Sequence, residues 1–237
     1  MLQGDYLSVL EAGNRDEFRE AVVRFAQRMG FETVSAMTVV DKGINAAEFV
    51  NIDNTPPGFQ DIFSGTGSGL HDPVMQHCKR QTVPIIWGQQ TYLSSGSIDM
   101  WEHQAQFGYR NGIAMALHMP EGRHFMLGVD RDQSLPVNSE ELTRLVADLQ
   151  LFAVHAQDTA MRVLVSSQAQ PERPALKPRE LEVLRWTMDG KTAWETGVLL
   201  GVTERTVVMH LQHGMKKLDC TSKHQAVLKA LRLGLIY

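Results

Sequence analysis

The sequence lacks the features that mark secreted and membrane proteins. Its 237 residues include only two cysteines, too few for a disulfide framework, and both can remain thiols in a reducing compartment. No stretch approaches the roughly 20 consecutive apolar residues of a membrane span. The first residues contain no basic segment followed by a long apolar one, so we expect no signal peptide and a cytoplasmic protein without a membrane partner.

Motifs of common catalytic and metal centres are also missing. The sequence contains no Gly-x-Ser-x-Gly, His-Glu-x-x-His or Cys-x-x-Cys pattern, and five histidines of its front domain lack the spacing of metal ligands. The front of the chain has no lysine at the end of an apolar strand, which a phosphorylated receiver domain needs. We therefore expect no enzyme, no metal site and no cofactor.

Charge is unevenly distributed along the chain. The formal net charge is -4, but residues 171–237 hold 11 Lys and Arg against 7 Asp and Glu, and the other 170 residues hold 12 against 20. An acidic front and a basic tail predict two domains with different partners. Residues 166–174 contain two prolines and no apolar period, which predicts a linker between domains at 1–165 and 175–237.

Hydrophobic periodicity predicts an α+β fold for the front domain, an α-β-α sandwich. We expect helices over 14–29, 72–79, 100–107 and 140–163, and strands over 32–40, 112–119 and 124–129. The apolar stripe of the 140–163 helix fits either a dimer interface or intramolecular core.

The tail pattern predicts an all-α domain of four helices. Helices are expected to begin at Pro178, Thr192, Thr203 and Thr221 or Ser222. Two short helices joined by a tight turn at Gly201 form a helix-turn-helix, whose second helix, 203–218, would enter the DNA major groove. In the last helix we expect four inward residues, Ala226, Val227, Ala230 and Leu231.

Several side chains on and around this second helix are placed to meet DNA. The basic ones would contact phosphates, and the others would face the groove. The expected DNA contacts are Lys191, Thr192, Arg205, Thr206, Val208, Met209, Gln212, Lys216, Lys217 and Lys223. Pattern and charge alone leave open a solvated basic face on a small helical bundle.

A continuous run of tail motifs points to one family. The run includes Lys177-Pro-Arg-Glu180, Gly190-Lys191-Thr192, Gly201-Val-Thr-Glu-Arg205 and the ending Gln225–Ile236. It resembles the DNA-binding domain of LuxR-type quorum-sensing regulators, whose near-invariant positions fall on Glu180, Leu184 and Gly190. The resemblance implies double-stranded DNA as a partner and a homodimer that reads a palindromic operator.

The front domain resembles, more loosely, the autoinducer-binding domain of the same family, through Asp72-Pro73, Trp87 and Phe107–Gly112. In that domain the Asp accepts a hydrogen bond from the amide N–H of an acyl-homoserine lactone, and the Trp packs on the lactone ring. By resemblance the ligand site would contain Thr55, Phe59, Phe63, Asp72, Pro73, Trp87, Trp101 and Gly112.

Several positions depart from the family pattern. Phe59, Phe63 and Thr55 stand where the family has Trp and Tyr donors, and phenylalanine cannot donate a hydrogen bond. The resemblance therefore implies a lactone or a related, more apolar signal. Val208 replaces a basic residue, which suggests an altered operator, and Thr196-Gly197 replaces Ile-Ala, which should weaken that helix by up to ~1 kcal/mol.

Two functions compete on this evidence. The first is a ligand-responsive regulator of transcription. The alternative is a ligand-independent DNA-binding regulator whose front domain is a dimerisation or protein-interaction scaffold.

Overall fold

The chain folds into two compact units that divide between Gln168 and Ala169. In this computed structural model the described residues are 2–43, 46–59, 71–165 and 174–237. Phe63 and all of the expected linker except Pro174 lie outside these described residues.

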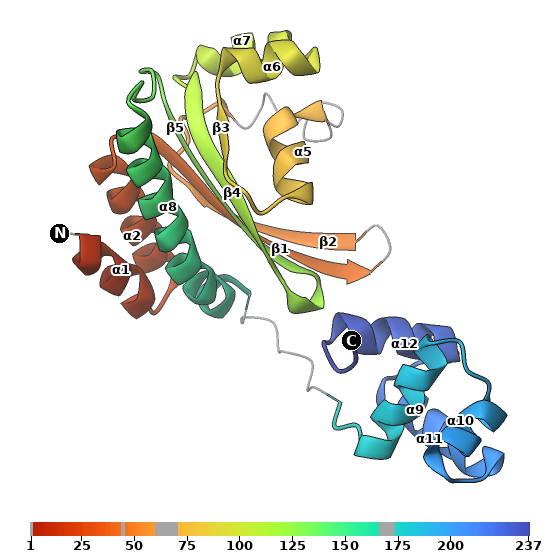
Figure 1. Ribbon diagram of the computed structural model, residues 1–237. Coiled ribbons are helices and arrows are strands. Elements are labelled where there is room, and N and C mark those ends of the chain that lie inside the picture. Colours follow the sequence, from red (N-terminus) through yellow and green to blue (C-terminus); the bar gives the residue numbers. More distant parts are fainter. Residues whose placement is uncertain (1, 44–45, 60–70, 166–173) are drawn as a thin grey trace. The chain divides into compact units, whose positions relative to one another are not determined.

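The first unit places helices on both faces of one sheet (Figure 1). In chain order its elements are α1 (Leu2–Glu11), α2 (Arg15–Arg28), β1 (Thr33–Gly43), β2 (Ala46–Asp53), α5 (Pro73–Arg80), β3 (Ile85–Trp87), α6 (Gln89–Ser95), α7 (Ile98–Ala105), β4 (Asn111–Met119), a 3-10 turn (Pro120–Gly122), β5 (Arg123–Arg131), α8 (Ser139–Ala160) and a π-helical end (Met161–Val165). The predicted α-β-α sandwich is confirmed, but α1, β2, β3 and α6 are absent from the predicted pattern.

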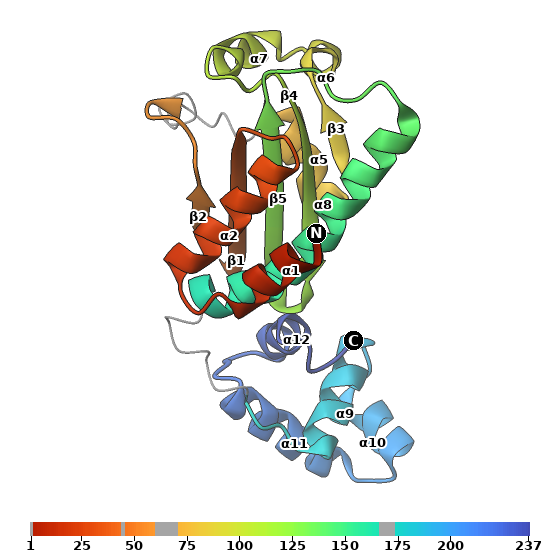
Figure 2. The same cartoon turned by 90° about the vertical axis from the view of Figure 1, so that its left-hand side faces the viewer.

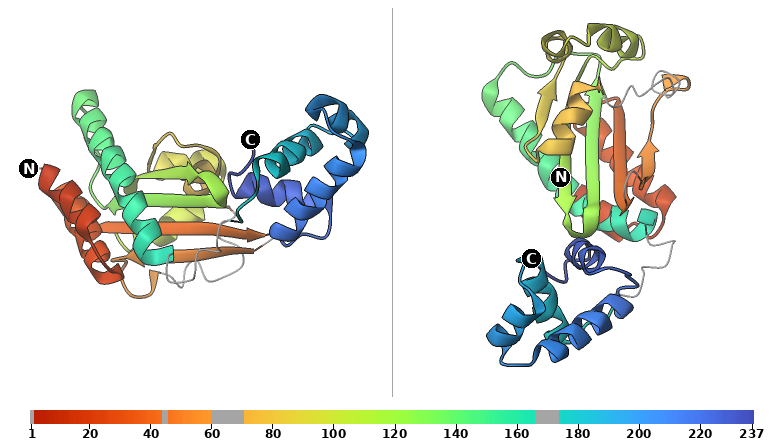
Figure 3. Two further views of the ribbon diagram at one scale, coloured as in Figure 1. Left: turned by 90° about the horizontal axis from the view of Figure 1, so that it is seen from below. Right: turned by 90° about the vertical axis from the view of Figure 1, so that its right-hand side faces the viewer.

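The sheet has five antiparallel strands in the order β2-β1-β5-β4-β3. Figure 2 shows α1, α2 and α8 in front of one face, and Figure 3 shows α5, α6 and α7 on the other side of the strands. Because side chains alternate between the faces of a strand, each face packs against its own set of helices.

A first hydrophobic core lies between the sheet and α1, α2 and α8. The rings of Phe25 and Phe152 stack there with centroids 3.8 Å apart, and both side chains are buried. Leu149, Phe152 and Ala156 of the apolar stripe of α8 are fully buried in this core, and the first part of the stripe is partly buried against it. These residues of the stripe therefore form intramolecular core.

A second hydrophobic core occupies the opposite face of the sheet. On β4, Ala114 and Ala116 belong to it, whereas Ile113 and Met115 belong to the first core. Its buried members are Val74, Cys78, Trp87, Tyr92, Tyr109, Ala114 and Ala116, packed against Phe59, Ile85, Met100, Trp101, Phe107 and Met126. This core is rich in aromatic rings and in small strand residues.

The second unit is a four-helix domain. It contains α9 (Pro178–Met188), α10 (Ala193–Leu200), α11 (Glu204–Lys217) and α12 (Lys223–Arg232), capped by Thr192, Thr203 and Ser222 as predicted. Gly190 and Gly201 end α9 and α10 with φ of 78° and 66°, a conformation that glycine adopts without strain.

The core of the second unit corrects one expectation. Ala226 and Ala230 of α12 are fully buried beside Leu184, but Leu231 is 38% exposed. Residues 226 and 230 are four apart and share one face, so residue 231 is turned away from the core. Ile236, which follows the helix and is 1% exposed, is buried in the same core.

Gly197 has a packing role in addition to its low helix propensity. A Cβ atom at this position would lie 2.8 Å from the Val202 carbonyl oxygen and 3.3 Å from the Glu204 nitrogen. The missing side chain lets the turn between α10 and α11 approach the helix closely. Gly197 therefore affects stability in two ways: glycine has a low helix propensity, and it permits this close backbone contact.

Candidate functional site

Asp72 is held at the start of α5, on the second-core face. Its carboxylate caps the helix by accepting the Val74 amide at 2.9 Å, and Pro73 occupies the first helical turn. The same oxygen accepts the Tyr92 hydroxyl at 3.2 Å. Asp72 is only 7% exposed, so the sequence places a buried, partly satisfied carboxylate against the second core.

Burial dominates the protonation of this carboxylate. It raises the pKa of Asp72, while hydrogen bonds from Val74, Tyr92 and Met75 lower the pKa and only partly offset the effect. A further donor near the carboxylate would therefore be favourable, because a buried charge gains from every hydrogen bond it accepts.

Trp87 lies over Gly112 on the neighbouring strand. The two residues are paired between β3 and β4, and a Cβ atom on Gly112 would fall 2.6 Å from Cε2 and Nε1 of the indole. Glycine is therefore required for the indole to lie flat on the sheet. Trp87 also meets Tyr92 edge to face, with centroids 5.8 Å apart. Tyr92 therefore connects the Trp87 indole to the Asp72 carboxylate, which its hydroxyl binds.

Three other expected ligand residues already make contacts within the protein. Phe59 stacks on Tyr109 with centroids 3.9 Å apart, and Trp101 packs at the margin of the second core. The Trp101 indole N–H donates to the Arg110 carbonyl at 3.0 Å, and the Thr55 hydroxyl donates to Asp53 at 2.8 Å. These two polar groups already have partners within the protein.

Four polar residues of this region escaped the sequence analysis. Tyr92, Gln104 and Tyr109 come from α6, α7 and the loop before β4, and Asp130 comes from β5. Each is less than 10% exposed. Tyr92 links Asp72 to Gln104, whose oxygen lies 3.5 Å from the tyrosine hydroxyl. Tyr109 lies within the Phe107–Gly112 motif, but nothing in the sequence marks its hydroxyl, or the other three side chains, as facing a ligand.

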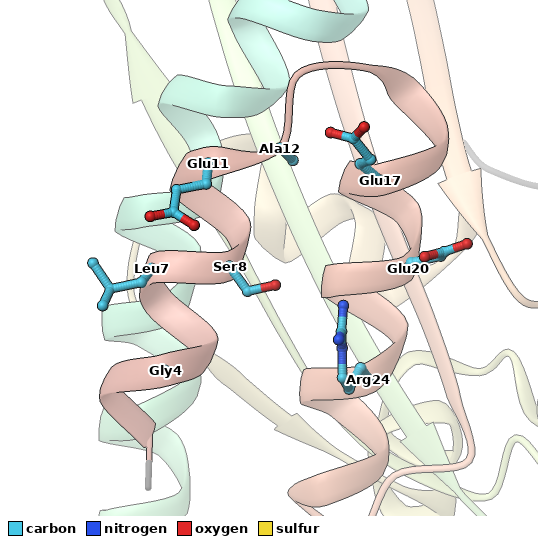
Figure 4. Close-up of a pocket in the computed structure, with 8 residues that line it drawn as sticks. All are labelled: Gly4, Leu7, Ser8, Glu11, Ala12, Glu17, Glu20 and Arg24. Carbon is cyan, nitrogen blue, oxygen red and sulfur yellow. The ribbon is translucent and has the colours of Figure 1, made fainter.

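A groove on the other side of the unit is lined by α1 and α2 (Figure 4). Its polar side chains are Ser8, Glu11, Glu17, Glu20 and Arg24. The glutamates and the arginine are exposed, and none of the expected ligand residues lines it. Among the expected ligand residues, Phe59, Trp87 and Trp101 lie instead on the second-core face or at its margin.

The expected DNA-reading surface forms on α11. Arg205, Val208, Met209 and Gln212 are exposed along one side of the helix, and together with Thr203 and Thr206 they line a hollow. Thr192 and Thr206 are partly occupied by helix capping, since their hydroxyls bond Glu195 and Thr203. Lys191, Lys216 and Lys223 are exposed and form no salt bridge among the described residues.

Lys217 differs from the other expected phosphate contacts. Its ammonium donates to the Glu180 carboxylate at 2.8 Å and to the Ala175 carbonyl at 3.0 Å. Glu180 also accepts the Lys177 amide at 2.7 Å, so the carboxylate caps α9 where Lys177 cannot. Burial raises the pKa of Glu180, but the bonds from Lys217 and Lys177 outweigh it, and the pKa is lowered.

Leu184 and Gly190 have the structural roles expected from their residue types. Leu184 is fully buried in the core of the second unit, where Gly214 of α11 packs against it. Gly190 ends α9 in a left-handed conformation, and the Lys191 amide bonds back to the Trp186 carbonyl.

None of the described helices is both long and apolar enough to cross a bilayer. Within the same residues, no three His, Cys, Asp or Glu side chains are grouped to hold a metal ion.

Comparison with protein families assigns both units. The family described as autoinducer binding domain matches residues 14–160, and the family described as bacterial regulatory proteins, luxR family, matches residues 174–230. The two matches cover the sandwich and the helix-turn-helix in that order.

Curated relatives match over most of their length. The chain is 28% identical over 226 residues to the transcriptional activator protein AhyR of Aeromonas hydrophila, which covers 93% of this chain and 86% of AhyR. It is 30% identical over 213 residues to the quorum sensing-dependent transcriptional regulator RpaR of Rhodopseudomonas palustris, which covers 87% and 83%.

Solved structures agree in fold. The crystal structure of Escherichia coli SdiA has a TM-score of 0.77 at 23% identity and covers 100% of this chain and 98% of SdiA. SdiA in complex with octanoyl-rac-glycerol has a TM-score of 0.76 at 22% identity, covering 100% and 95%. The chain therefore belongs to the LuxR family, and it is a ligand-responsive quorum-sensing regulator that binds DNA and is not an enzyme.

Proposed function

We propose that the signal is an acyl-homoserine lactone or a related apolar acyl compound bound on the second-core face of the sheet. The observation that carries this proposal is the buried Asp72 carboxylate, which accepts a hydrogen bond from Tyr92, whose ring in turn meets the Trp87 indole edge to face. A carboxylate in an aromatic site suits a ligand with one polar N–H or O–H group and an apolar body.

The strands beneath this site favour an acyl chain. Gly112, Ala114, Ala116 and Gly128 present almost no side-chain volume on this face of β4 and β5, and Met126 lies among them. Small strand residues beneath aromatic rings would let an extended acyl chain lie close to the sheet. The bound octanoyl-rac-glycerol named for SdiA, which has the same fold, is an acyl chain of this kind.

We further propose that the chain acts in the cytoplasm as a homodimer on a palindromic operator. The exposed side of α11 would lie in the major groove, with Val208 and Met209 suited to thymine methyl groups. Arg205, Lys191 and Lys216 would contact the flanking phosphates. Two such helices would read half-sites about one helical turn apart.

The test compares the full-length chain with its Asp72→Asn variant. Asparagine still caps α5 through its oxygen, but it turns an amide donor toward the ligand in place of a carboxylate. Losing a charge-assisted hydrogen bond costs about 1.5–3 kcal/mol, so binding of N-octanoyl-homoserine lactone should weaken roughly 10- to 100-fold by calorimetry.

Asp41→Asn provides the matched control, because the Asp41 side chain is 51% exposed on β1, where it lies 3.7 Å from His124. This variant should bind the lactone as the wild type does. Equal affinity of the Asp72 variant and the wild type would remove Asp72 from the site. Failure of the wild type to bind N-octanoyl-homoserine lactone or octanoyl-glycerol would overturn the proposed ligand class.

A further inference from the structure

A row of paired residues crosses the sheet on the ligand face. Trp87 pairs with Gly112, Gly112 pairs with Asp130, and Asp130 pairs with Thr33. Asp130 follows Met126 by four residues along β5, so both side chains point to the second core. Gly112 stands between Trp87 and Asp130 in this row. Since Gly112 has no side chain, the Trp87 indole lies directly over it.

Asp130 is an unusual residue for such a place. It is 8% exposed, and within the described chain no hydrogen bond reaches its carboxylate. Burial, and the nearby charge of Asp72 second, raise the pKa of Asp130 to about 8. At neutral pH this side chain is therefore mostly a neutral acid, able both to donate and to accept a hydrogen bond.

Two buried donors in the same region also lack acceptors. In the described part of the chain, the Gln104 amide nitrogen and the Tyr109 hydroxyl have no acceptor, although their residues are 3% and 5% exposed. Burial and then the Asp130 charge raise the pKa of Tyr109, and a hydrogen bond donated by the Thr33 side chain lowers it by less. The Tyr109 O–H itself has no acceptor among the described residues. Asp130 also acts electrostatically on Tyr92, which bonds Asp72. These polar side chains therefore form one cluster.

Unpaired buried donors are costly unless something binds them. A buried donor without a partner loses its hydrogen bonds to water and gains none, so a cluster with two of them and an unpaired acid suits a ligand that supplies the partners. Phe59, which cannot donate, stacks directly on Tyr109, which can. The Tyr109 hydroxyl therefore supplies, next to Phe59, the hydrogen-bond donor that Phe59 lacks.

We propose that Tyr109, Gln104 and Asp130 bind the head group of the ligand and select an uncharged head with at least two acceptor oxygens. This inference rests on the proposed acyl ligand and names its polar end. Tyr109 and Gln104 donate to carbonyl or hydroxyl oxygens of the head, while Asp72 accepts its N–H or O–H.

The cluster selects against charged heads for two reasons. An anionic head, such as the carboxylate of a ring-opened lactone, would lie near the Asp72 carboxylate, and like charges in a buried site repel strongly. A cationic head could pair with the acids but offers no lone pair, so Tyr109 and Gln104 would stay unsatisfied.

The experiment measures calorimetric binding of three octanoyl or octyl probes to the full-length chain: N-octanoyl-homoserine lactone, N-octanoyl-homoserine and octylamine. We expect the lactone to bind at least tenfold more tightly than either charged probe. Tyr109→Phe removes one hydroxyl and should weaken lactone binding about tenfold, while the melting temperature of the ligand-free chain stays equal or rises.

Tyr6→Phe is the matched control. The Tyr6 hydroxyl is also buried without a partner in the described residues, but Tyr6 packs against the first core on the opposite face. This variant should bind the lactone like the wild type. Asp130→Asn, which keeps a neutral side chain of the same shape, should retain lactone binding within about threefold, whereas Asp130→Leu should lose it.

The possible failures are distinguishable. Lactone binding that is lost in Asp72→Asn but unchanged in both Tyr109→Phe and Asp130→Leu overturns the head-group assignment and leaves the proposed function intact. Tighter binding of octylamine than of the lactone overturns the selection for an uncharged head. A wild-type chain that binds no acyl probe overturns the proposed ligand class, and this inference with it.

Discussion

At the residue scale, the chemistry of the ligand face depends on side chains whose importance comes from burial. Asp72 was predicted because it belongs to a motif with Pro73. Asp130, Gln104 and Tyr109 are ordinary polar residues in the sequence, and only strand register and the packing of α6 and α7 bring them together. Phe59 was predicted as a departure from the family, but its stacking on Tyr109 depends on a turn whose path the sequence does not specify.

The buried Asp130 carboxyl leads to a prediction about how the free energy of unfolding depends on pH. Its pKa is about 8 in the folded chain and about 4 when unfolded. Between these values the folded state holds a proton that the unfolded state lacks, so the free energy of unfolding falls as pH rises from about 4 to about 8. The slope reaches at most about 1.4 kcal/mol per pH unit and vanishes above this window.

Urea denaturation of the full chain at pH 6, 7 and 8 checks this pH dependence. Asp130→Asn stays neutral at every pH and should flatten the profile, whereas the exposed Asp41→Asn should keep the wild-type slope. Identical slopes in all three proteins would show that Asp130 is ionised in the folded chain at neutral pH.

At the element scale, long periodic helices were predicted well and short elements were not. The α8 and α11 patterns extend over several turns, so their helices follow from the sequence to within about three residues. β3 has three residues and α6 has seven, too few for a period to be recognised. The role of α8 was ambiguous for another reason, because an apolar stripe alone does not distinguish intramolecular core from a dimer interface.

The contact between α9 and α11 carries a prediction of its own. Glu180 is 1% exposed and binds Lys217, so Glu180→Gln leaves a half-buried lysine without its partner. We expect a loss of about 1–3 kcal/mol from the stability of the helix-turn-helix unit. Because the pKa of Glu180 is lowered, the contribution of the carboxylate is present at neutral pH and is lost as pH falls through its folded pKa.

Glu182 on the same helix provides the control. It pairs with Arg179 at 2.8 Å, but both side chains are more than a third exposed, and exposed pairs contribute about 0–1 kcal/mol. Thermal unfolding followed by circular dichroism should therefore separate Glu180→Gln from Glu182→Gln. Equal effects would mean that the Glu180–Lys217 bond adds no more than a surface pair.

At the scale of the whole molecule, the net charge of -4 combines an acidic sensor with a basic DNA reader. The unequal charge predicted two domains, and the family matches to residues 14–160 and 174–230 agree with two roles. They favour the ligand-responsive regulator over the scaffold alternative. Neither charge nor pattern could reveal that Lys217 is used inside the second unit.

The salt dependence of DNA binding tests the phosphate contacts of the helix-turn-helix unit. Each phosphate contact contributes about -0.9 to the slope of log K against log salt. For a dimer on a DNA duplex of about 30 base pairs, Lys216→Gln should therefore reduce the slope by about 2. Lys79→Gln, an exposed change on α5, should leave it unchanged. A slope that is the same in both variants would remove Lys216 from the DNA interface.

The two cores on opposite faces of one sheet also bear on how such a receptor changes during evolution. The residues that hold α1, α2 and α8 in place are different from those that face the signal, although they alternate along the same strands. A substitution at an even-numbered position of β4 or β5 can therefore alter which molecule is detected while the first core keeps the fold. This separation gives the lineage a route from one chemical signal to another through intermediates that still fold.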